Sequence, residues 1–209
     1  MKVTIIIGKI WAKLMPYSLY RGLQAVKIRY CLAMYDDYFR KKCSSYGINC
    51  RIYNPDRIAG LENISIGNNF TIGEHSILET ISSYQGEKFQ PKISIGNNVS
   101  FGKRSHIGCI NKIVIGDNLL TGSNVLITDH GHGGSSYDQL VTDPKERNLT
   151  SKGAIIIGQN VWIGDKASLL AGITIGDNVV IGANSVVTHN IPSNCVVCGN
   201  PAKVVKYVK

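Results

Sequence analysis

The sequence predicts an all-β fold in which the chain winds as a parallel β-helix, and a repeat of six residues is the main reason. From residue 157 an aliphatic residue recurs at every sixth position, and glycine follows it at four of six places. These positions are Ile157, Ile163, Leu169, Ile175, Ile181 and Val187. A period of six fits neither the 3.6 residues of an α-helical turn nor the heptad of a coiled coil, so both are excluded for residues 64 to 191.

The same period runs through the earlier part of the repeat region, where insertions interrupt it. Its members there are Ile66, Ile72, Leu78, Ile95, Phe101, Ile107, Ile115, Thr121 and Ile127. The register slips by two residues between 107 and 115, whereas 127 and 157 are thirty residues, or five whole repeats, apart. The insertions therefore interrupt the winding without ending it.

The residues between the aliphatic positions indicate how each repeat folds. Short β-branched segments such as ISIG, IVIG and AIIIG favour strands, and the Gly, Asn and Asp residues between them tolerate the positive φ of tight corners. Three sides, each one strand and one corner, close a triangular coil. Coils stacked at the sheet spacing of about 4.8 Å bury a continuous aliphatic column. We therefore expect residues 56–209 to form the β-helix domain, with its periodic aliphatic residues in the core.

Residues 1–55 lack the repeat and read as one or two helices broken around Pro16. Apolar residues recur there at helical spacing, with Lys and Arg between them. They are Ile6, Ile10, Leu14, Leu23, Val26 and Tyr30. Two compatible interpretations stand: a cap over the open end of the β-helix, which solenoids need, and a basic amphipathic segment, residues 1–42, that rests on an anionic membrane.

Composition limits the classes of partner and the compartment. The net charge of +9 predicts attraction to an anionic partner, but no aromatic or basic module accompanies it, so nucleic-acid binding ranks last. No run of 18 apolar residues and no convincing secretory signal is found, and the cysteines are scattered. We expect a cytoplasmic protein with reduced thiols, peripheral at the inner face of the membrane if the first segment binds lipid.

The C-terminal run IGQNVWIGDKASLLAGITIGDNVVIGANSVVTHNIPSNCVVCGNPAKVVK resembles the hexapeptide-repeat acyltransferases. It is similar to the galactoside and maltose acetyltransferases and to the O-acetyltransferases of capsule and O-antigen synthesis. The resemblance covers roughly residues 60 to 206. It implies a left-handed β-helix, a homotrimer, and acetyl-CoA as co-substrate with no metal.

The segment ITDHGHGG, residues 127 to 134, begins a loop excursion from residue 131 to 153, and in similar enzymes such a loop carries the catalytic base. A gapless match from Val125 places that base on His132, with His130 as a second residue that orients the acceptor; the two roles stay open. Histidine suits the chemistry because a neutral imidazole can take the proton of a sugar hydroxyl as it attacks a thioester.

The same match implies contacts to the cofactor. Asp165 and Ala183 would contribute backbone amides, and the remaining positions are Trp162, Thr188, His189, Lys203 and Lys206. Asp165 stands where a small residue is usual and His189 where Lys is frequent, which sets these two apart from the family pattern. The two lysines suit the phosphates of coenzyme A as point charges. Trp162 opens a strand in VWIG at an outward position, where trimer packing is the alternative to ligand binding.

We therefore expect an acetyl-CoA-dependent O-acetyltransferase of a sugar hydroxyl, acting on a precursor of capsule, O-antigen or exopolysaccharide. An antibiotic acetyltransferase is an alternative on the same scaffold. A zinc-bearing or purely structural β-helix is an alternative of another class. Zinc would need three convergent histidines, such as His75, His106 and either His130 or His132, whose spacings are not multiples of an 18-residue coil.

Overall fold

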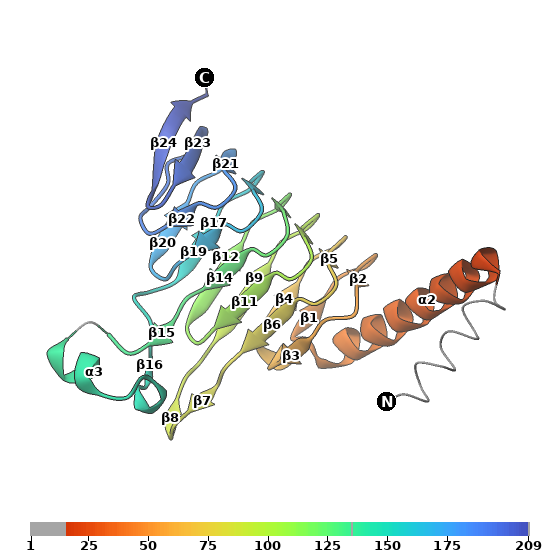
Figure 1. The fold of residues 1–209 in the computed structure, drawn as a ribbon, viewed down its shortest axis with the longest axis horizontal. Helices are drawn as coiled ribbons and strands as arrows, with labels where there is room; N and C mark the ends of the chain where they lie inside the picture. Colours follow the sequence, from red (N-terminus) through yellow and green to blue (C-terminus); the bar gives the residue numbers. More distant parts are fainter. Residues whose placement is uncertain (1–15, 135, 209) are drawn as a thin grey trace.

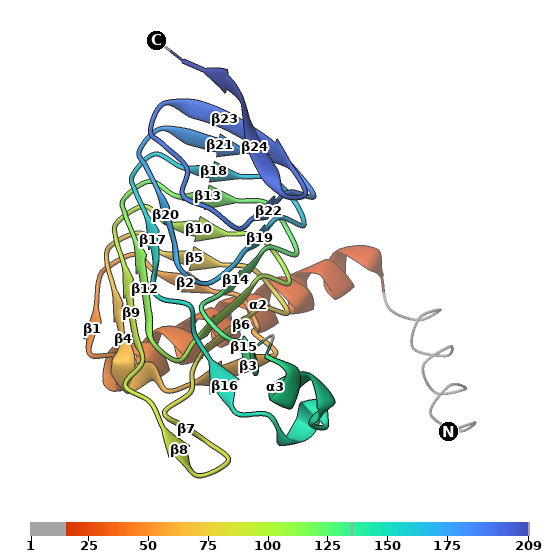
Figure 2. The same cartoon turned by 90° about the vertical axis from the view of Figure 1, so that its left-hand side faces the viewer.

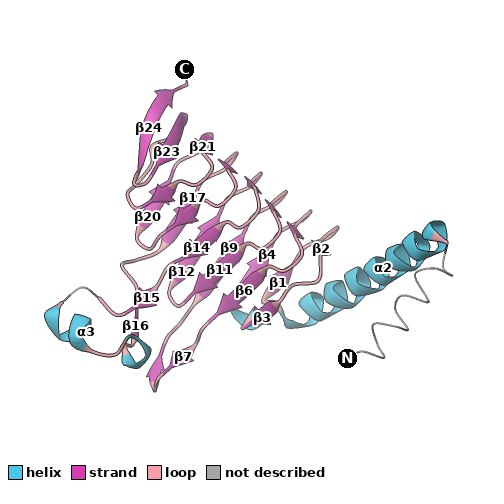
Figure 3. Ribbon diagram, in the orientation of Figure 1, coloured by secondary structure: helices cyan, strands magenta, loops and turns pink. Residues whose placement is uncertain are grey.

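The computed structural model describes residues 16–134 and 136–208 and is a parallel β-helix, as the repeat predicts, with the left-handed winding that the family resemblance implies. In the described part of the chain, three parallel sheets form the sides of a triangular prism, and each coil adds one strand to each side. Figure 1 shows the coils stacked from the N-terminal end, beside helix α2, to the C-terminal strands β23 and β24. Figure 3 shows how few helices accompany the strands.

The sides of the prism consist of short strands in parallel register. The first side comprises β1 (Ser45–Tyr46), β4 (Ile64–Ile66), β9 (Lys92–Ile95), β12 (Lys112–Ile115), β17 (Ile155–Ile157) and β20 (Ile173–Ile175). The second comprises β2 (Arg51–Ile52), β5 (Thr71–Ile72), β10 (Ser100–Phe101), β13 (Leu120–Thr121), β18 (Trp162–Ile163), β21 (Val179–Ile181), β23 (Cys195–Gly199) and the antiparallel β24 (Ala202–Tyr207). The third comprises β3 (Arg57–Ala59), β6 (Ile77–Thr80), β11 (His106–Cys109), β14 (Leu126–Thr128), β19 (Ser168–Leu169) and β22 (Val186–Val187).

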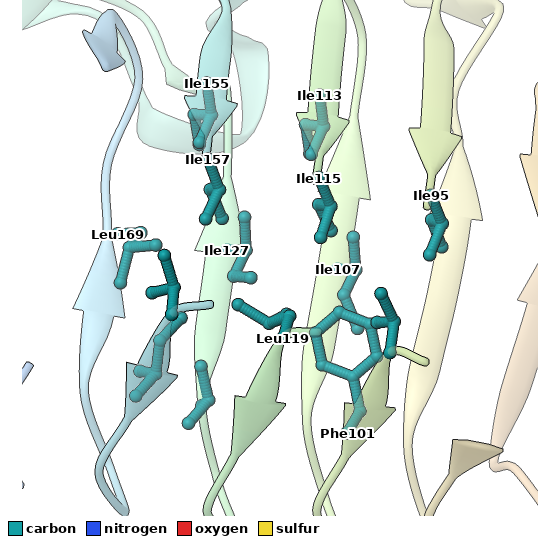
Figure 4. Close-up of a cluster of buried hydrophobic side chains, with 14 of the residues drawn as sticks. Ile95, Phe101, Ile107, Ile113, Ile115, Leu119, Ile127, Ile155, Ile157 and Leu169 are labelled. Carbon is teal, nitrogen blue, oxygen red and sulfur yellow. The ribbon is translucent and has the colours of Figure 1, made fainter. Parts of the chain in front are cut away.

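The core is the predicted column of periodic side chains. Every periodic residue named above, from Ile66 to Val187, keeps 5% or less of its accessible surface. Figure 4 shows Ile95, Phe101, Ile107, Ile115 and Ile127 pointing into the space between the sheets. Burial of one such side chain contributes about 1.5–3 kcal/mol, so the stacked column provides the main stabilisation of the prism.

The corners depend on residues that accept a left-handed backbone. Asn98, Asn118, Asn160 and Asn178 all have φ between +57° and +60°. Their side-chain amides form a ladder along one edge of the prism, with successive Nδ2 to Oδ1 distances of 3.0, 2.9 and 3.0 Å. At another corner a Cβ on Gly102 would overlap the backbone of Gly122 in the next coil. Close backbone approach explains why glycine follows so many of the aliphatic positions.

The coils differ in length, which explains the slip in the repeat. Ile93 pairs with Ile113, twenty residues further on, whereas Ile155 pairs with Ile173, eighteen residues further on. The two additional residues lie between the third side and the first. A coil of this protein is therefore not always 18 residues long.

Helix α2 (Tyr17–Lys42) begins directly after Pro16, and the first of the two expected helical segments lies outside the described residues. Its C-terminal part packs on the first coil through Phe39, whose ring centroid lies 5.9 Å from that of Tyr46, and it also contacts the 3₁₀ turn η1 (Leu61–Asn63). The middle of α2, around Ile28 and Leu32, lies beside Ile52 and Tyr53, and the first turns of the helix project past the first coil (Figure 1). As a cap, α2 thus covers the end of the prism with its middle and last turns.

Other expectations for the N-terminal part turn out differently. The apolar stripe of Leu23, Val26 and Tyr30 is exposed and does not pack, while Ile6, Ile10 and Leu14 lie outside the described residues. Parallel pairing already begins at Ser45, ahead of the domain boundary at residue 56, because the six-residue spacing already runs through Tyr46, Ile52 and Ile58, which pair with Ile66, Ile72 and Leu78. None of the described helices is long and apolar enough to span a bilayer.

Two insertions leave the prism at the edge between its third and first sides. The first is a hairpin of β7 (Ser83–Tyr84) and β8 (Glu87–Lys88). The second is the predicted excursion, which contains β15 (Gly131–His132), α3 (Tyr137–Val141), the 3₁₀ turn η2 (Pro144–Glu146) and β16 (Leu149–Thr150). Figures 1 and 2 show both insertions on the same side of the molecule.

Candidate active site

A buried carboxylate lies where the chain leaves β14 for the excursion. Asp129 has no exposed surface, and its oxygens accept hydrogen bonds from the backbone N–H groups of Ile110 and Asn111, both at 2.9 Å. The thiol of Cys109 donates to the same carboxylate at 3.2 Å. These three donors belong to the corner of the preceding coil, which folds around the side chain of Asp129.

The donors keep Asp129 ionised. Burial alone raises the pKa of a carboxyl group, but the hydrogen bonds from His130, Ile110, Cys109 and Asn111 outweigh it and hold the pKa of Asp129 below its usual value. Burial and the neighbouring carboxylate together raise the pKa of the Cys109 thiol far above its usual value. At neutral pH the pair is therefore a carboxylate and a protonated thiol, which excludes Cys109 as a thiolate nucleophile.

His130 is held by this carboxylate. Its Nδ1 lies 3.2 Å from Oδ1 of Asp129 and 3.3 Å from Oγ1 of Thr128, and its side chain is 13% exposed. A carboxylate accepts the proton of Nδ1–H and so favours the tautomer in which Nε2 carries the lone pair. His130 opens onto a surface groove that is lined by Thr128, Thr150, Lys152, Leu170 and Thr188 among others. The geometry is that of an imidazole oriented by a carboxylate at the edge of a surface groove.

His132 has different surroundings. It lies in β15, is exposed, and its ring meets the edge of Tyr84 in the hairpin, with centroids 5.5 Å apart and an interplanar angle of 75°. The hairpin also reaches the excursion through Gln85, whose side-chain amide donates to the carbonyl of Lys145. His132 therefore belongs to a contact between the two insertions, which we call the clasp (Tyr84, Gln85, His132 and Lys145).

A third histidine, His106, lies near His130, and the sequence pattern alone gives it no role in transfer. His106 projects from β11, and its Nε2 lies 3.2 Å from Oε1 of Glu79 in the neighbouring strand β6. Nε of Arg57 lies 2.9 Å from Oε2 of Glu79 without hydrogen-bond geometry. In the sequence, Glu79 and His106 appear only as two outward-facing positions on adjacent coils. They can be recognised as neighbours only when the length of the coil in this region is known.

The predicted cofactor residues lie on different parts of the prism. Thr188 lines the groove beside His130, and its hydroxyl is 2.7 Å from Nδ1 of His189. Trp162 is 54% exposed on the outer face of the second side, as its strand position predicts. Along that side Trp162 pairs with Val180, Val180 with Val196 and Val196 with Lys206, so that Trp162 and Lys206 share one face.

The other predicted contacts occupy a corner and the C-terminal end. Asp165 and Ala183 lie at corresponding corners of successive coils between the second and third sides, and the side chain of Asp165 accepts from the backbone N–H of Ser123. Lys203 is exposed and pairs with Cys198. One subunit therefore brings His130 and Thr188 together but leaves Trp162 and Lys206 on a different side.

The prediction about metal needs a correction in its reasoning. On a coil of 18 residues the histidine spacings argue against convergence, yet His106 and His130 both lie against Gly108, because the coil there is twenty residues long. His75 instead pairs with Asp56, with Nδ1 and Oδ1 2.9 Å apart. Among the described residues, no group of three or more His, Cys, Asp or Glu side chains could hold a metal ion.

The coil and this groove define a class of protein, the acyltransferases built on a left-handed β-helix, and comparison with known proteins gives the family. The family model "Bacterial transferase hexapeptide (six repeats)" matches residues 154–189, and "Hexapeptide repeat of succinyl-transferase" matches residues 92–129. The chain is 36% identical over 162 residues to the Escherichia coli (strain K12) protein named "Putative lipopolysaccharide biosynthesis O-acetyl transferase WbbJ". That match covers 76% of this chain and 79% of the relative. The chain belongs to the hexapeptide-repeat transferase family and is an acetyltransferase.

Solved structures agree with this assignment. A maltose O-acetyltransferase from Clostridium difficile 630 is 31% identical, with a TM-score of 0.54 over 83% of this chain and 74% of that chain. A galactoside acetyltransferase in complex with coenzyme A is 28% identical, with a TM-score of 0.55 over 83% and 70% of the two chains. The expected family and the expected enzyme class are both confirmed.

Proposed function

We propose that this protein transfers an acetyl group from acetyl-CoA to a hydroxyl of a sugar, in the assembly of a cell-surface polysaccharide. The observation that carries the proposal is the buried Asp129 carboxylate that orients His130 at the edge of a groove. The relative named for lipopolysaccharide biosynthesis supports the acceptor class, and the solved galactoside acetyltransferase with bound coenzyme A supports the donor.

The transfer needs no covalent acyl-enzyme. Asp129 stabilises the tautomer of His130 with a free Nε2, and Nε2 takes the proton of the acceptor hydroxyl as its oxygen attacks the thioester carbonyl. The new C–O bond forms while the C–S bond breaks, the thiolate of coenzyme A leaves, and the imidazolium returns the proton to that sulfur. Acetyl ester and free coenzyme A are the products, so atoms and charge balance without any further reactant.

The choice of base departs from the expectation based on the gapless match. That match favours His132, but His132 makes a T-shaped contact with Tyr84 and is not among the residues that line the groove, whereas His130 contacts the carboxylate and lines the groove. We propose His130 as the base. His132 then acts in the clasp, on the acceptor side of the site.

The distribution of the cofactor residues supports a homotrimer. Trp162 and Lys206 lie on the second side of the prism, and His130 and Thr188 belong to the third. A groove lined by both sets requires the second side of one subunit to face the third side of a neighbour. We propose that acetyl-CoA lies in this groove, with its acetyl group near His130 and its phosphates near Lys203 and Lys206.

We further propose that α2 rests on the inner, anionic face of the cytoplasmic membrane. Its first part carries Arg21, Lys27 and Arg29 with no acidic residue before Asp36, and its apolar side chains are exposed. Charge reversal in the full chain, R21E/K27E/R29E, should abolish sedimentation with anionic vesicles at low salt. Equal sedimentation of the variant, or binding to neutral vesicles alone, would overturn this contact.

The function is tested by thiol release from acetyl-CoA with a panel of acceptors. The panel contains methyl glycosides of common hexoses, nucleotide sugars, polysaccharide fragments and hydroxyl-bearing antibiotics. We expect acceptor-dependent release of thiol and an acetyl ester on a sugar. Acetylation of the antibiotics only, or no acetylation by a protein that binds acetyl-CoA in calorimetry, would overturn the proposed acceptor class.

A further inference from the structure

Glu79 is a buried carboxylate that the proposed transfer does not use. It is 7% exposed, although it lies on an outward position of β6. Its two oxygens face His106 and Arg57, at 3.2 and 2.9 Å, and Oε2 has no hydrogen bond among the described residues. Burial of a carboxylate is unfavourable in free energy, which indicates that Glu79 has a function at this position.

The Glu79–His106 pair faces the Asp129–His130 pair across a glycine. Glu79, Gly108 and Thr128 are direct neighbours on strands β6, β11 and β14. A Cβ on Gly108 would lie 3.2 Å from Cε1 of His130 and 3.3 Å from Nε2 of His106. Because residue 108 has no side chain, the two imidazole rings approach each other over its Cα more closely than a methyl group there would allow.

The two carboxylates hold their histidines by opposite nitrogens. Asp129 contacts Nδ1 of His130, which leaves Nε2 free, whereas Glu79 contacts Nε2 of His106, which leaves Nδ1 free. A carboxylate favours the tautomer that carries the proton on the nitrogen facing it. Nδ1 of His106 is therefore a hydrogen-bond acceptor on a side chain that is 41% exposed. In the neutral ring this nitrogen accepts a hydrogen bond from a group such as a hydroxyl.

We propose that His106 binds a second hydroxyl of the acceptor, next to the hydroxyl that His130 deprotonates, and that Glu79 is the residue that positions His106. The acceptor is then a sugar with two neighbouring free hydroxyls. This inference rests on the proposed function and specifies the acceptor of the same site. His130 remains the base because it adjoins the groove at Thr188, while His106 lies on the opposite side of Gly108.

The test combines changes in the enzyme with changes in the acceptor, as in a double-mutant cycle. The probes are methyl β-D-galactopyranoside and methyl α-D-glucopyranoside, each with its monodeoxy analogues, and the enzymes are wild type, His106→Phe and His106→Gln. We expect wild type to prefer the diol in kcat/KM by about tenfold or more over the analogue that lacks the neighbouring hydroxyl. Both variants should lose that preference while the KM for acetyl-CoA is unchanged.

The role of Glu79 is separated from a purely structural one by rescue. Glu79→Gln keeps an oxygen that accepts from Nε2–H of His106 and should retain part of the preference, whereas Glu79→Ala should lose it. His75→Asn is the matched control: it removes an exposed histidine that pairs with a carboxylate, and Asn accepts the φ of +59° at that position. Thermal melting of each variant reports its folding.

The outcomes distinguish the two proposals. Acetyl-CoA binding without acetylation of any sugar would overturn the proposed function and this inference together. Acetylation of the sugars with full preference for the diol in both His106 variants would overturn the role of His106 alone. An unchanged preference in Glu79→Ala would overturn the positioning role of Glu79.

Discussion

Replacement of Asp129 by asparagine should reduce both stability and turnover. The carboxylate accepts from two backbone N–H groups at 2.9 Å, of Ile110 on Oδ1 and Asn111 on Oδ2. An amide has one acceptor oxygen, so its NH₂ group must face one of these donors and leave it without a partner. Loss of one buried hydrogen bond costs about 1–3 kcal/mol, and loss of the charge weakens the other, so we expect a decrease of about 3 kcal/mol in the free energy of unfolding.

The effect on turnover follows from the tautomer of His130. An asparagine NH₂ group that faces Nδ1 would favour the tautomer with the proton on Nε2, where the hydroxyl proton must go. We expect kcat to fall by about 10² or more, with a small effect on the affinity for acetyl-CoA.

The stability difference should depend on pH in a defined direction. The folded protein lowers the pKa of Asp129 below that of the unfolded chain, about 3.9 for an aspartate. The stabilisation by the charge is therefore fully present above about pH 4 and is lost as the pH falls through the lower, folded-state pKa. Wild type and Asp129→Asn should converge in stability below about pH 4.

Urea unfolding followed by circular dichroism at pH 7, 5 and 3.5 measures this difference. Asp177→Asn is the matched control, because Asp177 also accepts from a backbone N–H, that of Gln159 at 2.8 Å, but at an exposed corner where water can replace it. We expect the control to change stability by less than about 1 kcal/mol. Equal losses in the two variants, or a difference that grows toward acid pH, would refute the reasoning.

Three further predictions concern the core, the corners and the cofactor. Ile127→Ala, at a fully buried position, should lower stability by about 2–5 kcal/mol, and Leu126→Ala on the outer face of the same strand should cost less in the same unfolding assay. Gly102→Ala should impair folding, because its Cβ would overlap the backbone of the next coil. Gly22→Ala, with open space in α2, should stabilise the helix by about 0.5–1 kcal/mol. The soluble yield and the melting temperature of each variant test these two expectations. Replacing Lys203 and Lys206 by Ala should raise the KM for acetyl-CoA about tenfold but leave the KM for acetyl-dephospho-CoA unchanged, because only acetyl-CoA carries the 3′-phosphate. Equal effects on the two KM values would show that these lysines do not bind the 3′-phosphate.

The periodic part of the fold was predictable because each position repeats the same physical requirement. Ile157, Ile163 and Leu169 occupy equivalent places in a coil, so one rule places them all in the core. The first coil, from Ser45, has the same spacing at Tyr46, Ile52 and Ile58, but it was not recognised because Tyr46 is aromatic and no glycine follows Ile52 or Ile58. Helix α2 was predicted, but its exposed apolar residues show that helical spacing alone does not tell which face finds a partner.

The candidate site was predictable only in part. The crowding of His130 and His132 at the start of the excursion indicated the place where the structure has the buried Asp129 carboxylate and the groove. Their different environments could not be derived, because they depend on where the corner at Ile110 and the hairpin at Tyr84 lie in space. Glu79 and His106 are 27 residues apart and become neighbours only through a coil whose length includes the hairpin insertion.

The central claim is that His130, held by Asp129, is the base of acetyl transfer to a hydroxyl, and single-turnover kinetics of two variants test it most directly. With each enzyme saturated with acetyl-CoA and mixed with the best sugar acceptor, His130→Ala should transfer the acetyl group about 10² to 10⁴ times more slowly than wild type, with unchanged affinity for acetyl-CoA. His132→Ala should be slowed by less than about tenfold, chiefly through a higher KM for the acceptor. A normal rate in His130→Ala together with a large loss in His132→Ala would contradict the account.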